Sequence, residues 1–307
     1  MNRRLPTLAL ALSGLLWGCS APLTKVALGA LGPAWLTAVR FVLAALPLLW
    51  VARRGLRGAL SPAVVLGGAV GYGLVVALWN LGLARTSVSH GALMVGAVPA
   101  MVALVAVLAG RGTAGGRAWA GFALAVAGVA LIAADGGDAS LAGDLLVLAS
   151  MLISAAFTVW QPDLLAGRDP LAVTAVQFTA SALPAVAFAA LTEGSPVPAA
   201  GVVGPGAWVA VAALGLVGTL APFTLFAWAQ TRTTPEVAGA FLNLEPVVGA
   251  VAGAVAFGDP FGRLQVTGGL AVLLGIALSA LPQGALRVPD RLTGGGTRLR
   301  ALAVPGR

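Results

Sequence analysis

Ten apolar runs limit the ways in which this chain can fold, because each is close to the length that an α-helix needs to cross a bilayer. With 59% hydrophobic and only 9% charged residues among 307, most of the surface must face lipid. The runs are continuous, whereas a membrane β-barrel requires short segments that alternate polar and apolar residues. The sequence therefore predicts an all-α integral membrane protein with ten transmembrane helices. Their approximate limits are 5–27, 33–52, 62–83, 88–109, 117–134, 143–161, 170–191, 206–229, 237–257 and 264–281.

Two blocks of the sequence recur. One lies within 85–131 and returns at a shift of 147, and the other lies within 38–47 and returns at a shift of 137. The matched pairs include Arg85 and Arg232, Thr86 and Thr233, Phe41 and Phe178, Pro99 and Pro246, Gly121 and Gly268, and Gly128 and Gly275. We therefore predict one five-helix repeat at 1–135 and a second at 140–282. A tail at 283–307, rich in Gly, Pro and Arg, is predicted to be disordered and cytoplasmic.

Five spans are an odd number, so the second repeat must enter the membrane with the opposite orientation. Such inverted repeats are typical of secondary transporters, in which two similar halves exchange conformations to give alternating access. When loops are assigned in alternation from a cytoplasmic start, 14 of the 18 Lys and Arg fall inside and only Arg85 and Arg263 fall outside. The positive-inside rule then predicts a multi-pass protein of the cell inner (cytoplasmic) membrane with both termini in the cytoplasm.

Three charged residues are predicted to lie within spans, namely Lys25, Arg40 and Glu245. A charge at that depth costs at least ~2.5–3.5 kcal/mol on insertion scales, so each must face the protein interior, water or a partner. Glu245 is the main functional candidate. It is interpreted either as a proton-coupling group or counter-charge to an amino substrate, or as one half of a fixed salt bridge to Arg40 or Lys25. Its counterpart in the first repeat is Val98, so the carboxylate is not part of the symmetric frame.

Arg40 matches Gln177 in the second repeat, so this position carries a hydrogen-bond donor in both halves. An arginine there could grip a carboxylate or phosphate with its planar fork, or it could bond to carbonyls between helices. Lys25 could contribute to a site or extend to the outer interface.

The other polar or amphipathic candidates near a substrate path are Trp17, Trp79, Asn80 and Asn243, although Asn commonly joins helices and Trp is common at the headgroups. His90 opens the fourth span near the outer surface and is interpreted as a structural cap or a proton relay. Pro99 and Pro246 are hinge candidates. The glycines that recur seven residues apart in the fifth and tenth spans predict close helix packing.

Enzyme chemistry is not expected. The chain has one His and one Cys, no carboxylate cluster at metal spacing and no phosphate-binding loop, so we predict no catalytic residues, metal or cofactor. The net charge of +8 follows the topology, and no basic stretch is interleaved with aromatic residues as in nucleic-acid binding. The predicted partners are the lipid bilayer and a small-molecule substrate, and the oligomeric state is left open.

Short motifs in a fixed order give the chain a family resemblance over residues 7–282. These motifs are Trp17 and Gly18, Pro33 followed by Arg40 and Phe41, Ala92 to Pro99, Gly143 and Asp144, Leu244 to Pro246, and Gly268 to Gly275. The chain resembles the drug/metabolite transporter superfamily, specifically the EamA-type permeases. At Asp259 it differs from the Glu that is usual in that family.

The resemblance implies an inner-membrane carrier, an exporter more than an importer, with a central cavity lined by spans 1, 3, 4, 6, 8 and 9. We therefore expect a secondary transporter that exports small metabolites such as amino acids or drug-like compounds. The alternatives are a non-transporting membrane scaffold or sensor, and an importer or uniporter of a small metabolite.

Overall fold

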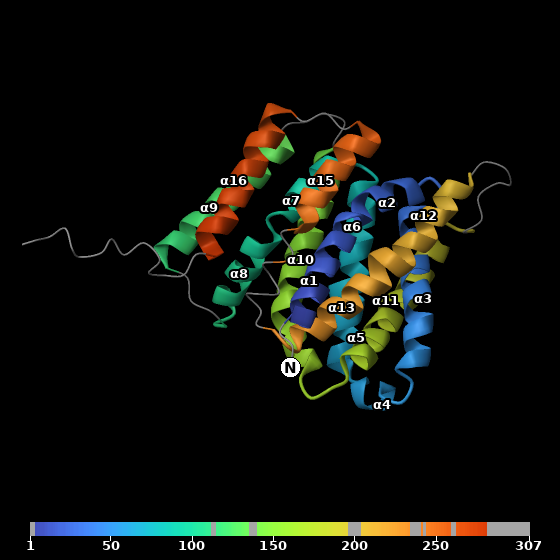
Figure 1. Cartoon of the computed structure of the whole chain (residues 1–307). Coiled ribbons are helices and arrows are strands. Elements are labelled where there is room, and N and C mark those ends of the chain that lie inside the picture. The colour runs from blue at the N-terminus through green and yellow to red at the C-terminus, as the bar shows by residue number, and fades with distance from the viewer. Residues whose placement is uncertain are drawn as a thin grey trace, which may run out of the picture.

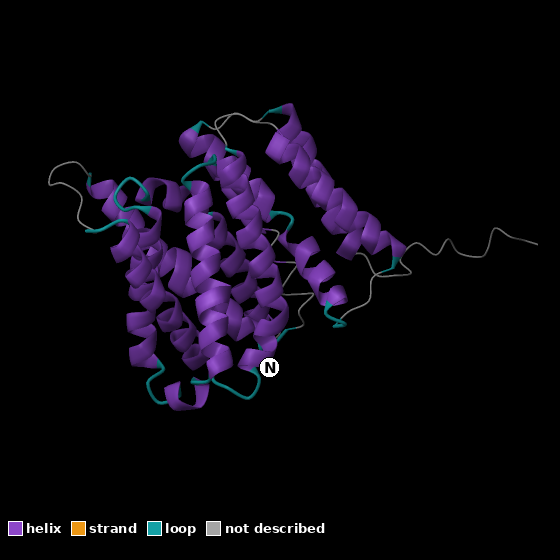
Figure 2. Cartoon of the chain, turned by 180° about the vertical axis from the view of Figure 1, so that it is seen from behind, coloured by secondary structure: helices purple, strands orange, loops and turns teal. Residues whose placement is uncertain are grey.

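The computed structural model describes residues 4–111, 115–134, 140–195, 204–233, 241, 244–258 and 262–280. Within these ranges the chain is helical and contains no strand (Figure 2). The helices form one bundle, with α9 (Gly116–Ala134) and α16 (Arg263–Ala280) side by side at its edge (Figure 1). Asn243, Asp259 and the tail at 283–307 lie outside the described residues.

Helices lie within or across each of the ten ranges expected from the sequence. The first repeat contains α1 (Arg4–Gly18), α2 (Ser20–Ala27), α3 (Pro33–Val51), α4 (Leu56–Ala59), α5 (Pro62–Gly68), η1 (Ala69–Leu74), α6 (Val75–Leu83), α7 (Val88–Val95), α8 (Val98–Leu108) and α9. The second contains α10 (Leu141–Leu165), α11 (Pro170–Thr192), α12 (Pro205–Gly215), η2 (Leu216–Leu220), α13 (Ala221–Gln230), α15 (Leu244–Phe257) and α16.

Seven helical segments of the described chain are long and apolar enough to cross a membrane. They are Leu5–Ala27, Pro33–Val51, Pro62–Leu83, Val88–Leu108, Leu141–Leu165, Pro170–Thr192 and Pro205–Gln230. Trp119–Ile132 in α9 is a shorter apolar helix, and α15 and α16 do not belong to this set. The all-helical membrane architecture is thus as predicted. Seven described helical segments meet the length and composition of a span, so the predicted number of ten is not confirmed.

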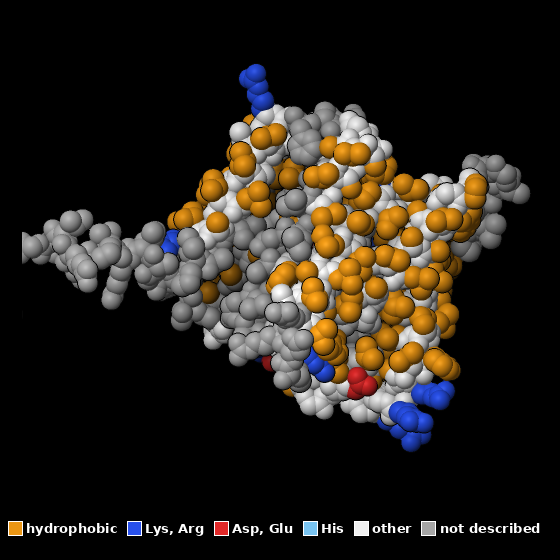
Figure 3. All heavy atoms as spheres, in the orientation of Figure 1, with side chains coloured by type: hydrophobic (Ala, Val, Ile, Leu, Met, Phe, Trp, Pro, Cys, Tyr) orange, Lys and Arg blue, Asp and Glu red, His pale blue; other side chains and the backbone are white. Residues whose placement is uncertain are grey.

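The bundle exposes many apolar side chains, as expected of a protein whose solvent is lipid, and its largely apolar interior also holds polar groups. Leu5, Leu8, Leu12 and Leu15 form an exposed stripe along α1. Hydrophobic side chains cover most of the described part of the visible face, and Lys and Arg appear at its margins (Figure 3). Seventeen polar or charged residues are buried in the described chain, and Arg40, Gln161 and Gln177 among them belong to the site described below or support it.

Equivalent helices of the two repeats pack against each other. The closest pair is α9 with α16, followed by α3 with α11 and α7 with α15. Phe41 in α3 contacts its own counterpart Phe178 in α11, with ring centroids 5.7 Å apart. The cross-packing pairs are also equivalent, because α1 packs on α13 as α6 packs on α10. The contacts therefore follow the repeat that the sequence shows.

The recurring glycines allow the α9–α16 contact. A Cβ added to Gly128 would lie 2.5 Å from the Gly268 carbonyl oxygen, and one added to Gly275 would lie 2.5 Å from the Gly121 oxygen. These backbones touch, which confirms the predicted close packing. Since 121 faces 275 and 128 faces 268, the two helices run antiparallel.

The helices of the first and fourth spans are interrupted, the first at Cys19, and the third and eighth spans each contain a π-helix. The fourth span breaks at Gly96 and Ala97, shortly before Pro99. In a continuous α-helix the ring of Pro99 would clash with the backbone carbonyl four residues earlier. Pro246 lies instead in the first turn of α15, where a missing N–H costs no hydrogen bond. The π-helices η1 and η2 begin at residues 69 and 216, which are related by the same shift of 147 as the sequence repeat.

Candidate functional site

A cavity of about 120 Å³ lies in the middle of the bundle, between the repeats. Its lining comes from the six spans that the resemblance implied and from Arg40 of the second span. The residues are Trp17, Ser20, Arg40, Gly71, Tyr72, Val75, Val76, Trp79, Val95, Val98, Ser150, Met151, Ser154, Phe157, Thr158, Gln161, Phe223, Phe226, Gln230 and Glu245. The cavity extends to Gln230, the last residue of α13.

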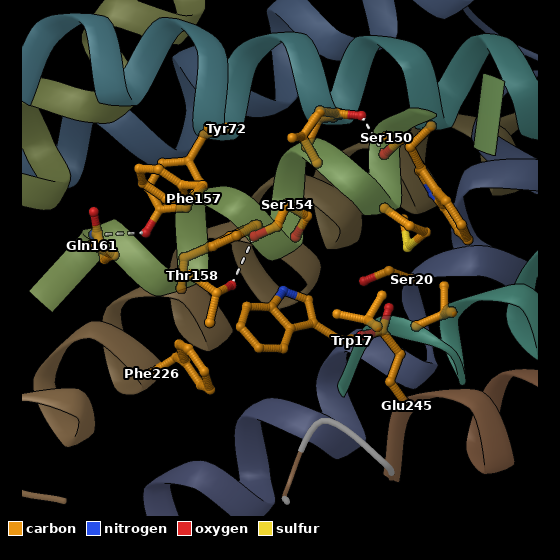
Figure 4. A pocket seen from close by; sticks show the side chains of 18 of the residues that line it. Trp17, Ser20, Tyr72, Ser150, Ser154, Phe157, Thr158, Gln161, Phe226 and Glu245 are labelled. Carbon is orange, nitrogen blue, oxygen red and sulfur yellow. Dashed lines mark hydrogen bonds between the residues drawn. The ribbon is translucent and has the colours of Figure 1, made fainter. Parts of the chain in front are cut away.

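Aromatic rings form one wall of this cavity. Tyr72 of η1 packs edge-on against Phe157 and Phe223, with ring centroids 4.9 and 4.6 Å away. Trp17 packs edge-on against Phe223 and Phe226, at 5.0 and 5.1 Å. The Trp17 ring stands in the middle of the cavity, between Ser20 and the side chains of α10 (Figure 4). Such edge-to-face pairs fix the ring positions and leave flat apolar faces for a ligand.

Arg40 lines the cavity from α3 and is 3% exposed. Its Nε donates to Thr219 Oγ1 at 2.9 Å, and one terminal nitrogen donates to the Gly218 carbonyl at 3.4 Å. Both acceptors lie in η2. The predicted bonding between helices is therefore present, and it joins α3 to the π-helix of the second repeat.

The equivalent place in the second repeat holds a neutral cluster. Gln177 of α11 and Gln161 of α10 exchange two amide hydrogen bonds, of 3.1 and 2.9 Å. The Gln161 amide also donates to the Tyr72 hydroxyl of η1 at 3.3 Å. Tyr72 and Thr219 are equivalent residues, related by the shift of 147. Arg40 of the first repeat therefore bonds to η2, and Gln177 of the second repeat is connected to η1 through Gln161.

Small residues explain why these π-helices can approach their neighbours. A Cβ on Gly68 would collide with the Gln177 backbone, and one on Gly71 with the Phe157 ring. Their counterparts Gly215 and Gly218 face Leu43 and Ser20 at 2.9 and 3.0 Å. Widened π-turns are frequent at functional sites, and both of these touch cavity residues.

Glu245 reaches the cavity from the first turn of α15, beside the first span. Its backbone carbonyl lies 3.1 Å from where a Cβ on Gly18 would stand. Two ion pairs form among the described side chains, His90 with Asp144 and Arg111 with Asp163. The fixed salt bridge between Glu245 and Arg40 is thus not formed in this structure.

The remaining candidates are spread over the bundle. Trp79 lines the cavity, while the Asn80 amide donates to Thr37 Oγ1 at 2.9 Å and joins α6 to α3. Lys25 Nζ donates to the carbonyls of Leu83 and Thr86 at 3.0 and 2.8 Å, at the end of α6. The structure brings together Trp17, Arg40, Trp79 and Glu245 in one lining, and it places Lys25, Asn80 and Gln177 outside that lining.

A buried cluster at the end of α6 was not anticipated from the sequence. The Asp144 carboxylate lies 3.0 Å from His90 Nδ1 and accepts from Thr86 Oγ1 at 2.8 Å. The other His90 nitrogen contacts the Ile132 carbonyl, so this cluster ties α7, α9 and α10 together. The cap of α7 is Ser87, which accepts from the His90 backbone N–H, and not the His90 side chain. The signal was present in the sequence, since a carboxylate at the start of a span requires a partner.

A model of the EamA-like transporter family matches the chain twice, at residues 5–134 and 141–281. The chain belongs to the EamA-like transporter family. A relative described as an uncharacterized transporter, from Archaeoglobus fulgidus, is 26% identical over 289 residues, which are 90% of this chain and 97% of the relative. One crystal structure matches with a TM-score of 0.66 at 22% identity, over 91% of this chain and 97% of that chain. This EamA-like chain therefore shares a known fold as well as a family.

Membership of the EamA-like family makes the protein a multi-pass membrane transporter with two copies of the family unit. The 120 Å³ cavity lies between these two copies, and a small-molecule substrate is implied. Five of the EamA-like motif residues noted in the sequence belong to its lining, namely Trp17, Arg40, Val95, Val98 and Glu245.

Proposed function

We propose that the chain is a secondary transporter that exports small amphipathic metabolites, such as amino acids or drug-like compounds, by alternating access between inverted repeats. The observation that carries this proposal is the cavity between the repeats, which combines an aromatic wall with one guanidinium and one carboxylate. Its volume of about 120 Å³ is below the ~300–1,000 Å³ of pockets for drug-sized ligands, which favours small cargo.

Several packing features support ten crossings arranged as inverted repeats. In an inverted pair, equivalent helices run in opposite directions, and the glycine contacts make α9 and α16 antiparallel. The same holds for α7 and α15, because Gly96 faces Pro246 while Ala92 faces Gly249. Two similar halves joined by such symmetric contacts can exchange conformations.

The distribution of closed and open ends favours loading from the cytoplasm. The Thr86–His90–Asp144 cluster closes the end of the bundle that the positive-inside rule assigns to the outside. The cavity extends the other way, to Gln230 at the proposed cytoplasmic end. An exporter must accept cargo from that side. We place the protein in the cytoplasmic membrane, with both termini in the cytoplasm.

Glu245 is proposed to carry the coupling proton or to balance an amino group of the cargo. It lines the cavity without an ion pair to Arg40, so its charge is available to a proton or a ligand. A carboxylate in a largely apolar cavity needs compensation of this kind. Pro99 and the break at Gly96 and Ala97, which lies between the cavity-lining residues Val95 and Val98, are proposed as the hinge of the fourth span.

The test is untargeted metabolite profiling of the medium around cells that express the wild type, Glu245→Gln or an empty vector. A matched control is Glu193→Gln, because Glu193 lies away from the cavity and bonds the Ala34 and Trp35 amides. We expect a compound enriched outside by the wild type and by Glu193→Gln only. The same metabolite levels in the medium of wild-type and empty-vector cells would contradict export. Unchanged export by Glu245→Gln would rule out the coupling role.

A further inference from the structure

The Arg40 end of the cavity contains more buried hydrogen-bond donors than acceptors. A guanidinium has five N–H donors, and the hydrogen bonds of Arg40 to described residues occupy two of them. Trp17 Nε1 is buried and has no hydrogen-bond partner in the described structure. An indole nitrogen can only donate, so this N–H could bond to an acceptor on a ligand.

These donors line the same cavity. Arg40 and Ser20 both donate to the Gly218 carbonyl, each at 3.4 Å, so the second span and the first meet at η2. Trp17 lies three residues before Ser20, and both side chains face the cavity (Figure 4). Arg40 and Ser20 therefore lie together, and all three side chains contribute polar groups to the cavity.

The charge of Arg40 is not balanced by the protein that surrounds it. The ion pairs of the described chain involve His90, Asp144, Arg111 and Asp163, and the acceptors at Arg40 are a hydroxyl and a carbonyl. Burying an ion costs several kcal/mol unless an opposite charge and good geometry compensate it. An anion that enters the cavity would supply both.

The second repeat shows that the fold does not require this charge. Gln177 occupies the position equivalent to Arg40 and is satisfied by Gln161 through two reciprocal bonds. A neutral amide thus serves the same packing position within the same architecture. The arginine in the first repeat adds an unbalanced charge, which points to a role in binding.

We propose that Arg40, with Trp17 Nε1 as an additional donor, anchors the carboxylate of the cargo. The inference rests on the transport function proposed above and names its substrate class: small monocarboxylates with an apolar body. One guanidinium balances one negative charge, and its planar fork matches two carboxylate oxygens. The aromatic wall of Tyr72, Phe223 and Phe226 takes the apolar part. A second negative charge on the cargo is disfavoured by the Glu245 carboxylate in the same cavity.

Affinity selection with mass spectrometry tests this assignment on the purified full-length protein. The probe is an equimolar mixture in which each carboxylate is matched by its amide: L-phenylalanine, L-leucine, L-threonine and 3-phenylpropionate with the four corresponding amides. The variants are Arg40→Gln, which installs the residue that the second repeat has here, and Trp17→Phe, which keeps a ring but removes the donor. Arg111→Gln is the control, because Arg111 is exposed and pairs with Asp163 outside the cavity.

We expect the wild type and Arg111→Gln to retain at least one carboxylate over its amide by about tenfold or more. Arg40→Gln should lose roughly 10- to 100-fold of that retention, as expected for a hydrogen-bonded charge, and Trp17→Phe a few-fold. Equal retention of amides, no retained carboxylate on the wild type, or unchanged retention by Arg40→Gln would each overturn the assignment. If Arg40→Gln does not fold, unchanged retention by Trp17→Phe overturns it.

Cell export separates this result from the transport proposal. If wild-type cells export a compound without a carboxylate and Arg40→Gln cells export it equally, the transporter stands and the anchor is wrong. If the wild type prefers carboxylates in binding but exports none, the anchor stands and export is wrong.

Discussion

Replacing Gly128 with alanine should force α9 and α16 apart. A Cβ at this position would lie 2.5 Å from the Gly268 carbonyl oxygen and 2.8 Å from the Val272 nitrogen, whereas ordinary contacts begin at 3.4 Å. Both obstacles are backbone atoms, which cannot rotate away. The helices must therefore separate by about 3.4 − 2.5 = 0.9 Å.

This displacement has an estimated energetic cost. Extra methyl groups in well-packed cores typically cost about 1–3 kcal/mol, and the loss here extends along the whole helix pair. We expect the midpoint of thermal unfolding in detergent to fall by roughly 2–10 °C for Gly128→Ala. Gly275→Ala should behave alike, because its Cβ would meet the Gly121 oxygen at 2.5 Å.

The matched control is Gly116→Ala, at the first residue of the same helix, where an added Cβ has no atom within 4 Å. The assay compares the three variants and the wild type by size-exclusion chromatography after graded heating. If Gly128→Ala unfolds at the same temperature as Gly116→Ala, the glycine contact does not hold the helices together and the reasoning fails.

Two further predictions concern the ends of the bundle. Asp144→Asn should destabilise the protein by about 3–5 kcal/mol, because it breaks a buried ion pair, whereas Asp163→Asn at an exposed pair should cost less than about 1 kcal/mol; equal melting temperatures would contradict this. In a Cys19→Ser background, a membrane-impermeant maleimide added to intact cells should label Gly204→Cys and not Gly58→Cys, since both glycines are open but the positive-inside rule puts them on opposite sides. The reverse pattern would invert the proposed topology.

Hydropathy was enough to predict the helices closely. The range 62–83 was expected as one span and is occupied by α5, η1 and α6, and 206–229 by α12, η2 and α13. Lipid explains this success, because a lipid-facing backbone must satisfy its hydrogen bonds within a helix, which leaves few alternatives to an apolar run. The π-helices were not predicted. They depend on contacts such as Gly68 against Gln177, which join residues more than a hundred positions apart.

The candidate site was predicted in part. Intramembrane polar residues must face the interior, so Arg40 and Glu245 were found by composition alone, and both line the cavity. The same rule selected Asn80, which joins α6 to α3 instead. The predicted depth of a polar residue in the membrane shows only that its side chain needs a partner. Which partner it finds depends on how the helices pack. The aromatic wall was missed because Tyr72 and Phe223 have no unusual position in an apolar run.

Repeat symmetry and function occupy different positions in this chain. Positions that keep the same residue in both halves, such as Phe41 with Phe178 or the glycines of α9 and α16, form the contacts between equivalent helices. Two of the positions that differ between the halves, Arg40 and Glu245, line the cavity. Glu245 and its counterpart Val98 both line the cavity, so one carboxylate breaks an otherwise apolar pair. Arg40 carries a charge and its counterpart Gln177 does not. A symmetric cavity would bind a molecule equally in two reversed orientations. If the cargo contacts both unmatched charges, as proposed above, they would hold it in a single orientation.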